Sequence, residues 1–204
     1  GCSSFSIPAV INVSAGPLVT LTSSLPNNIF CEGDSITFNA ETTLNSATYS
    51  FRINGVEVET STGFSYTASP GLLVDNDVIE VEVISDAGCS STSSLTVREN
   101  IIEGGVAIAE QTDVCFGDVA PTITVSNSID SSTVSGTIIY QWQVSIDDVS
   151  FTDIVGATNE VLLGSQSPIN DTTFFRRKTT VSYGEVGCSS FSIPAVINVS
   201  AGPL

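Results

Sequence analysis

The chain has 204 residues, with 22 acidic and five basic side chains, so its net charge at pH 7 is −17. We therefore expect no nucleic acid among its partners and no direct membrane insertion, because nucleic acids and anionic membrane surfaces bind cationic faces and no apolar run approaches the roughly 20 residues of a membrane helix. There is no His and no Met, which removes Ser-His-Asp and Cys-His catalysis. These exclusions favour a protein that is not an enzyme. No secretion signal is visible, so we expect mature or internal sequence.

The composition favours β-strands. Ser and Thr account for 53 of the 204 residues, whereas charged residues make up only 13%, a balance typical of many short strands with hydroxylated outer faces. The strand pattern is clear at Ile36, Phe38 and Ala40, which alternate with Thr37 and Asn39. This period of two predicts a half-buried strand.

Further strands are expected in the same half of the chain, at residues 18–23, 49–53, 56–59, 78–84 and 89–97. Asn54-Gly55 provides the two positive-φ residues of a tight hairpin, and Asp86-Ala87-Gly88 turns the chain into the last of these strands. About seven strands are expected between residues 18 and 99, which is the number in an immunoglobulin-like sandwich.

The second half of the chain repeats this plan after a seam at residues 99–105. Cys115-Phe116-Gly117-Asp118 takes the place of Cys31-Glu32-Gly33-Asp34, and Gly187-Cys188-Ser189-Ser190 takes that of Gly88-Cys89-Ser90-Ser91. Trp142 takes the place of Phe51. Both aromatic residues are expected in the cores, because a lone Trp on a central strand usually packs inside a sandwich.

The most informative feature is an identical repeat. Residues 1–18, GCSSFSIPAVINVSAGPL, recur unchanged at residues 187–204. An offset of 186 residues indicates one full period of a tandem array plus an overlap. A deliberate duplication of one strand, made to restore a lost sheet edge, is the alternative.

These observations predict an all-β fold with two tandem immunoglobulin-like β-sandwich domains per 186-residue repeat. Residues 1–17 are then the last strand of the preceding copy and a linker. The first domain spans 18–100 and the second spans 101–204, closed by a strand at 187–200.

Several motifs resemble those of a known family: Cys-Glu-Gly-Asp-Ser at 31–35, Asn-Gly at 54–55, Asp-Ala-Gly-Cys at 86–89, Tyr-Gln-Trp-Gln at 140–143, Gly-Ala-Thr at 156–158 and Thr-Phe-Phe-Arg at 173–176. Together they resemble the tandem immunoglobulin-like and PKD-like domains of giant cell-surface proteins of Bacteroidota, among them gliding-motility adhesins and other type IX-secreted proteins. The resemblance implies an extracellular, cell-surface fibre of many domains. It does not transfer a ligand.

The cysteines number five, but Cys2 and Cys188 occupy the same position in successive copies, which leaves four per period. An even count in an exported β protein favours disulfides, and the lack of His and of Cys-x-x-Cys argues against zinc. Homology between the two halves suggests the pairs Cys31–Cys89 and Cys115–Cys188.

Strand parity suggests other pairs. Six alternating strands place Cys31 and Cys89 about 20 Å apart, at opposite ends of one domain, whereas a disulfide needs Cα atoms within about 7 Å. The same parity places Cys31 opposite Cys188, and Cys115 opposite the Cys89 equivalent of the following copy. We favour this pairing slightly, and the homology-based pairs remain open.

Acidic residues in loops suggest calcium as the one metal to consider. They form three groups, Asp75 with Asp77, Asp147 and Asp148 with Asp153, and Asp113 with Asp118 near a domain end. Calcium takes such oxygen ligands, but no loop has EF-hand spacing and Asp is also an ordinary turn residue. We expect no other cofactor.

Two further features have simple interpretations. Arg176 and Lys178 alternate onto one face of a strand, where pairing with carboxylates is expected. Ser35 and Thr172 each follow an Asp in a short pattern that resembles the O-glycosylation signal of Bacteroidota. The spacing of the carboxylates is compatible with a glycosidase pair, but nothing in the sequence marks a cleft.

The functional hypothesis is a structural repeat unit of a long surface filament or adhesin stalk, whose partners are adjacent copies of itself; the surface ligand stays open. One alternative is a pilus-like subunit whose strand 1–14 inserts into a neighbouring chain. The other is a carbohydrate-binding module, which would need exposed aromatic platforms.

Overall fold

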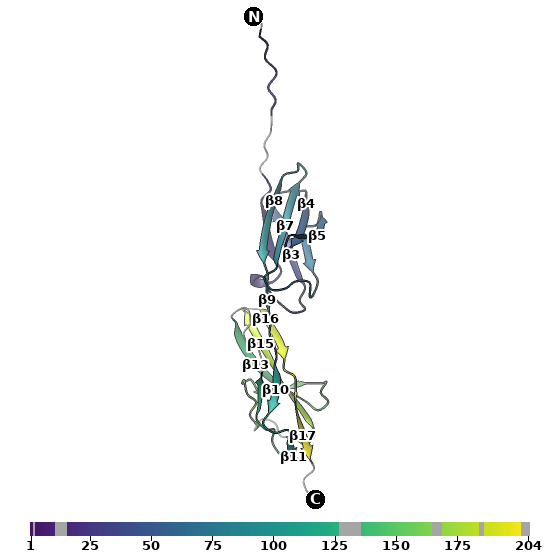
Figure 1. Cartoon of the computed structure of the whole chain (residues 1–204), viewed down its shortest axis with the longest axis vertical. Coiled ribbons are helices and arrows are strands. Elements are labelled where there is room, and N and C mark those ends of the chain that lie inside the picture. Colours follow the sequence, from purple (N-terminus) through teal and green to yellow (C-terminus); the bar gives the residue numbers. More distant parts are fainter. Residues whose placement is uncertain (2, 11–15, 127–135, 165–168, 184–185, 201–204) are drawn as a thin grey trace. The chain divides into compact units, whose positions relative to one another are not determined.

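The computed structural model describes residues 1, 3–10, 16–126, 136–164, 169–183 and 186–200 (Figure 1). These residues form β-strands and one short 3-10 helix, η1 (Pro26–Asn28), with no α-helix among them. None of the described segments is an apolar helix of membrane-spanning length. Packing divides the chain into two compact units, residues 1–24, 37–68 and 77–96, and residues 25–36, 69–76 and 97–204.

The first unit contains a three-stranded and a four-stranded sheet. The three-stranded sheet has the order β1-β3-β6, built from β1 (Val19–Ser23), β3 (Ile36–Thr42) and β6 (Ser65–Ala68). The four-stranded sheet has the order β5-β4-β7-β8, built from β4 (Ala47–Ile53), β5 (Val56–Ser61), β7 (Val78–Ser85) and β8 (Ser90–Thr96). The described part of these sheets holds seven strands, close to the number expected, and β6 is the one that none of the predicted ranges includes.

Aromatic rings join the two sheets of the first unit. Tyr66 of β6 lies 5.8 Å from Phe51 of β4 and 6.5 Å from Phe38 of β3, measured between ring centroids. Phe51 is fully buried, as are Val81 and Val83 on β7. The alternating apolar residues of both sheets therefore face one shared core, as a sandwich requires.

The tight hairpin between β4 and β5 forms at Asn54-Gly55. Asn54 has φ = 51° and Gly55 has φ = 80°, so both central residues adopt the left-handed conformation that a two-residue hairpin needs. The hairpin brings Ile53 opposite Val56.

The second unit is built around a large sheet with the order β11-β17-β15-β13-β14, in which β16 also pairs with β15. Its strands are β11 (Asp113–Cys115), β13 (Thr137–Ser145), β14 (Thr152–Asp153), β15 (Thr173–Tyr183), β16 (Val186–Phe191) and β17 (Ala195–Ser200). A second, two-stranded sheet pairs β10 (Val106–Ala109) with β12 (Ile123–Ser126).

The core of the second unit draws residues from both of its sheets. Trp142 of β13 and Phe175 of β15 are fully buried beside Ile123 of β12. The Trp142 indole N–H donates to the carbonyl oxygen of Asn159 at 3.0 Å, which satisfies its one polar group inside the core.

The strand predicted at residues 187–200 is two strands. β16 pairs with residues 178–183 of β15, and β17 pairs with residues 173–175. Between them the register shifts by one residue, because Phe191 lies opposite Lys178 whereas Ala195 lies opposite Phe175. Pro194 stands in this break, where it has no N–H to donate to a ladder.

A short parallel pair lies within the second unit although its strands come from the first half of the chain. β2 (Ile29–Cys31) pairs with β9 (Arg98–Asn100). The sequence boundary at residue 100 would instead assign both strands to the first domain. That boundary stays a prediction.

Candidate functional site

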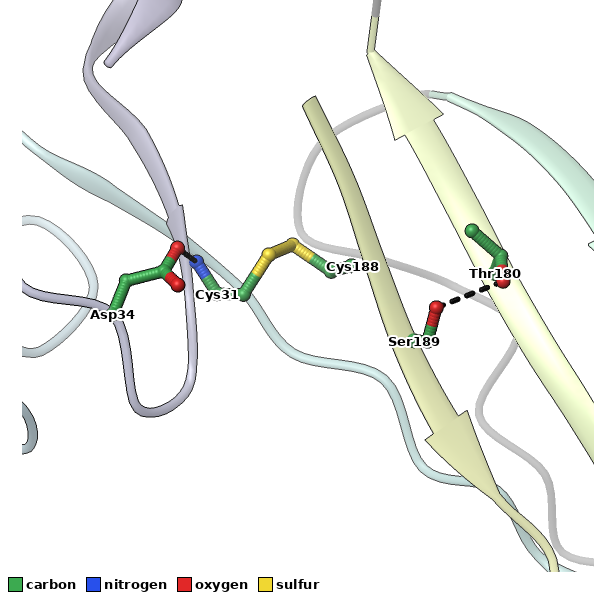
Figure 2. Close-up of a disulfide and its surroundings, with 5 residues drawn as sticks. All are labelled: Cys31, Asp34, Thr180, Cys188 and Ser189. Atoms are coloured by element: carbon green, nitrogen blue, oxygen red, sulfur yellow. Dashed lines mark hydrogen bonds between the residues drawn. A yellow bond between two sulfur atoms is a disulfide. The ribbon is translucent and has the colours of Figure 1, made fainter. Parts of the chain in front are cut away.

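The structure contains one disulfide among its described residues, which joins Cys31 to Cys188 with Cα atoms 5.4 Å apart (Figure 2). This is the pair that strand parity favoured, and it excludes the Cys31–Cys89 and Cys115–Cys188 pairs that homology suggested. The fifth cysteine, Cys2, lies outside the described residues.

A tight loop positions Cys31 at the end of β2. The backbone N–H of Cys31 donates to Oδ2 of Asp34 at 2.9 Å, and the N–H of Asp34 donates to the carbonyl oxygen of Cys31 at 3.0 Å. Gly33 has φ = 86°, a conformation that glycine adopts without strain. The Cys-x-Gly-Asp motif thus presents Cys31 on a closed, hydrogen-bonded turn.

The other half of the disulfide comes from a strand. Cys188 lies in β16 opposite Val181 of β15 and is 3% exposed. Beside it, the hydroxyl groups of Ser189 and Thr180 hydrogen-bond across the two strands at 2.8 Å (Figure 2). The disulfide is therefore held by the β15–β16 pair at Cys188 and by the hydrogen-bonded turn at Cys31.

A small pocket adjoins the disulfide and is lined by residues 31–32, 99–102 and 188–190. Burial raises the pKa of Glu99, and the nearby carboxylates of Glu32 and Asp75 raise it further. The Asn100 side chain is 2% exposed, and its amide nitrogen and oxygen have no hydrogen-bond partner among the described groups. The pocket is small, and Glu32 and Glu99 make it acidic.

A second copy of the cysteine loop exists at residues 115–118. The N–H of Cys115 donates to Oδ2 of Asp118 at 2.9 Å, and the N–H of Asp118 donates to the carbonyl oxygen of Cys115 at 3.0 Å. Gly117 has φ = 85°. The two hydrogen-bond lengths equal those of the Cys31 loop and the glycine φ differs by 1°, yet the Cys115 thiol is free and exposed.

The carboxylates considered for calcium bind groups of their own chain. Asp75 accepts hydrogen bonds from Arg98 at 2.9 Å and from the N–H of Glu99 at 3.0 Å. Asp77, which is 7% exposed, accepts one from the Asn54 amide at 2.7 Å. In the part of the chain that is described, no three Cys, Asp or Glu side chains gather to hold a metal ion.

The loop after β13 uses Asp147 in the same way. Its Oδ1 accepts from the Ser145 hydroxyl and from the N–H groups of Val149 and Ser150, at 2.7–2.9 Å. These bonds hold the pKa of Asp147 well below its usual range. The next residue, Asp148, has φ = 58°, so this acidic pair forms a turn.

The residues suggested for glycosylation are both at the surface. Ser35 lies just before β3 and Thr172 just before β15, and both side chains are exposed. A glycosyltransferase could therefore reach both hydroxyl groups, and glycosylation stays a prediction.

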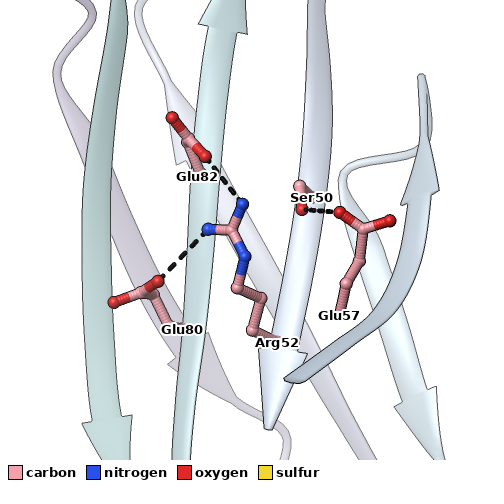
Figure 3. Close-up of polar contacts among 5 residues, drawn as sticks. All are labelled: Ser50, Arg52, Glu57, Glu80 and Glu82. Carbon is pink, nitrogen blue, oxygen red and sulfur yellow. Dashed lines mark hydrogen bonds and ion pairs between the residues drawn. The ribbon is translucent and has the colours of Figure 1, made fainter. Parts of the chain in front are cut away.

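Arg52 forms ion pairs that the sequence did not predict. Arg52 bridges Glu80 at 3.3 Å and Glu82 at 2.9 Å, while Ser50 beside it donates to Glu57 at 2.9 Å (Figure 3). The hydrogen bond from Arg52 is the main reason that the pKa of Glu82 is lowered. The face of β4 thus carries a cross-strand ion network.

The expectation that Arg176 pairs with a carboxylate is wrong. Its guanidinium lies 3.9 Å from the ring centroid of Phe151 and 4.1 Å from that of Phe191, and it donates to Gln143 at 2.8 Å. The two aromatic faces supply the negative potential that a carboxylate would otherwise supply.

The buried cation Arg177 was not predicted from the sequence. It is 1% exposed, lies 4.2 Å over the Tyr140 ring, and donates to the carbonyl oxygen of Glu160 at 3.0 Å. The available signal was its parity, because Arg177 shares the inward face of β15 with Phe175 and Thr179.

A sequence-family model described as a domain of unknown function (DUF8696) matches residues 104–201. No curated protein matches the chain.

Among solved structures, the chain is similar to three N-terminal domains of the Highly Immunogenic Outer Capsid protein (Hoc) of bacteriophage RB49. The TM-score is 0.50 at 14% identity, over 92% of this chain and 71% of that one. Fibronectin(III)-like modules of Clostridium thermocellum CbhA give a TM-score of 0.43 at 13% identity, covering 90% and 94% of the two chains. Murine CEACAM1b gives 0.41 at 12% identity, covering 90% and 100%.

The fold is therefore an all-β arrangement of tandem immunoglobulin-like sandwiches, which confirms the fold class predicted from the sequence. A disulfide such as Cys31–Cys188 is typical of proteins that fold outside the reducing cytosol.

Proposed function

We propose that the chain is a structural repeat unit of a long extracellular filament or adhesin stalk, in which tandem sandwiches act as a spacer that carries load. The observation that supports it most strongly is the identity of residues 1–18 with 187–204. The second copy of this sequence supplies β16 and β17 of the second unit. The first copy is then the same pair of strands of the preceding repeat.

The second unit has a hydrogen-bond geometry suited to load. Its entering segment runs parallel to its last strands: the N–H of Ile193 donates to Gly105 O at 2.8 Å, and Ala107 N–H donates to Ile193 O at 2.9 Å. Farther along, β11 pairs in parallel with β17, with Cys115 opposite Ser200.

When the Cys31–Cys188 bond is formed, Cys31 passes tension directly to Cys188, and the entering segment lies outside the covalent path. When the bond is reduced, tension would pull the entering segment and the last strand in opposite directions along their axes. Because interstrand hydrogen bonds run across the strands, parallel first and last strands are loaded in shear, and many bonds share the force at once. A unit built this way resists unfolding better than one whose terminal strands peel apart one bond at a time.

The surroundings follow from the resemblance and the charge. We place the array on the surface of a bacterium of the Bacteroidota, exported by type IX secretion, as gliding-motility adhesins are. The net charge of −17 keeps neighbouring arrays soluble and apart. Adhesion through many weak copies would gain strength by avidity.

The main rival is a pilus-like filament in which residues 1–14 insert into a separate neighbouring chain. In this chain β16 and β17 already occupy the edge of β15, so the strand pairing that such an insertion would use is filled. A carbohydrate-binding module is less well supported, because the lone Trp142 is buried.

The deciding experiment is the mass of the intact native polypeptide under denaturing, reducing conditions. We expect many multiples of the 21.2 kDa of this chain, which a covalently continuous array requires. A mass near 21.2 kDa would refute the continuous array and favour separate subunits.

A further inference from the structure

We propose that Cys115 of one repeat forms a disulfide with Cys89 of the following repeat. This inference rests on the proposed function, because it needs successive copies. In the chain as described, Cys89 is half-buried, Cys115 is exposed, and both thiols are free. A long array would therefore carry two unused thiols per period unless they bond to each other.

The backbone presents Cys115 as it presents the bonded Cys31. Each cysteine ends a short parallel strand pair, with Cys31 opposite Asn100 and Cys115 opposite Ser200. Each is followed by the same Gly-Asp turn, with hydrogen bonds of the same lengths. One loop is already bonded, so its duplicate is shaped for the same bond.

Cys89 likewise occupies the position of Cys188. Both cysteines lie in the sequence Gly-Cys-Ser-Ser at residues 88–91 and 187–190. Cys89 directly precedes β8, which returns antiparallel to β7, and Cys188 lies in β16, which returns antiparallel to β15. The N–H of Ser85 donates to the Cys89 carbonyl oxygen at 2.9 Å, which fixes Cys89 at the turn.

The spacing of the array would bring these two cysteines into reach. Five residues, 101–105, separate Asn100 from the start of β10. In the array, the four residues 201–204 separate Ser200 from the equivalent of Val19, where β1 begins. Such a connector spans at most about 18 Å, so each thiol meets a high effective concentration of the other.

The chemistry is thiol–disulfide exchange with a disulfide oxidant. The thiolate of one cysteine attacks the oxidant and forms a mixed disulfide, and the thiolate of the other then displaces the oxidant's remaining sulfur. The two cysteines lose two electrons and two protons, and the oxidant leaves as two thiols.

The test is a non-reducing peptide map of the native polypeptide after alkylation of free thiols. Trypsin cleaves after Arg52, Arg98 and Arg176, so Cys89 lies in the peptide 53–98 and Cys115 lies in the peptide 99–176. We expect these two peptides to be linked and neither cysteine to be alkylated. Alkylation of both, or a link from 53–98 to the Cys31 peptide, would overturn the proposal.

The 204-residue chain is the matched control, because it holds no following copy. In a glutathione redox buffer at low protein concentration, we expect Cys89 and Cys115 to stay reactive. At high concentration we expect covalent dimers, lost in both Cys89→Ser and Cys115→Ser. Closure of Cys89 onto Cys115 within a monomer would place the bond inside one copy and contradict the proposal.

The two proposals fail separately. A very long polypeptide with both thiols alkylated would contradict the disulfide and leave the array intact. A polypeptide of 21.2 kDa with the two peptides linked would contradict the continuous chain and leave the disulfide intact.

Discussion

Residues 1–10 and residues 187–196 have the same sequence and different structures. In the first segment, the described residues 1 and 3–10 form no strand and are exposed, with Phe5 95%, Ile7 93% and Val10 83% accessible. The second segment forms β16 and the start of β17, and buries Cys188 and Ala195 to 3% and 6% exposure. The same sequence can therefore be exposed without a strand or paired in a sheet, and it does not by itself decide between the two.

The difference comes from the edge of β15. A strand buries one face and pairs its backbone groups only when a neighbour supplies both the core and the ladder. Residues 187–196 have that neighbour, including an N–H from Arg177 that donates to Ser192 at 2.9 Å. The β-propensity of this sequence is therefore realised by its context.

Deleting each segment should give the largest contrast. Removal of residues 187–204 takes away β16 and β17, and with them Ile197 and Cys188 from the core, so we expect the second unit to unfold. Removal of residues 1–10 should leave the melting temperature unchanged. Fluorescence of Trp142, the one Trp in the chain, reports on the second unit. Equal effects of the two deletions would contradict the comparison.

A single side chain should show the same contrast. Ile197→Ala empties a fully buried position and should lower the free energy of unfolding by about 2–5 kcal/mol. The matched control Ile7→Ala removes the same atoms from an exposed position and should change it by less than about 0.5 kcal/mol. Urea denaturation followed by Trp142 fluorescence measures both free energies of unfolding. A loss of stability in Ile7→Ala comparable to that in Ile197→Ala would contradict the proposed difference between the two segments.

The disulfide should provide the next largest effect. Cys31→Ser opens a bond between residues 157 apart and should lower stability by about 2–4 kcal/mol under oxidising conditions. Cys89→Ser removes a free thiol and should leave the melting temperature of the 204-residue chain unchanged. The contrast should vanish when both proteins are measured in a reducing agent, and its persistence there would assign the effect to packing.

The smallest effect is expected at the aromatic position. Phe191→Leu keeps an apolar side chain but removes the ring that lies 4.1 Å from the Arg176 guanidinium, which should cost about 0.5–1 kcal/mol. Phe5→Leu, at the same place in the exposed copy, should cost nothing measurable. Thermal unfolding of the two variants, measured side by side, provides the test. Equal melting temperatures would show that the cation–π contact does not stabilise the fold.

The fold could be predicted largely because its signals are local. Alternation at Ile79, Val81 and Val83 faces these residues inward whatever the partner strand, and Asn54-Gly55 requires positive φ at two adjacent positions. The break at Pro194 was missed because period-two alternation continues through it. Only the register against β15 reveals the shift.

The site was harder to predict because its signals are not local. Strand parity predicted that Cys31, at the far end of one domain, faces Cys188, at the near end of the next. The Asp34 turn that presents Cys31 depends on hydrogen bonds that no sequence pattern displays. Arg177 faces inward by parity, yet a buried guanidinium is stable only with the Tyr140 ring and the Glu160 carbonyl beside it, and these partners lie 37 and 17 residues away in the chain.

The Cys31–Cys188 bond would also limit how far an array can lengthen. A period has 186 residues, and the bond joins two cysteines that are 157 residues apart. The chain between them no longer carries tension, so the covalent path under tension is only 29 residues long. At about 3.4 Å per residue, a fully unravelled period would reach roughly 100 Å, whereas the same period without the bond would reach roughly 630 Å. A fully unfolded fibre with this bond would be about one sixth as long as one without it, and would pass a pull to its far end with correspondingly less slack.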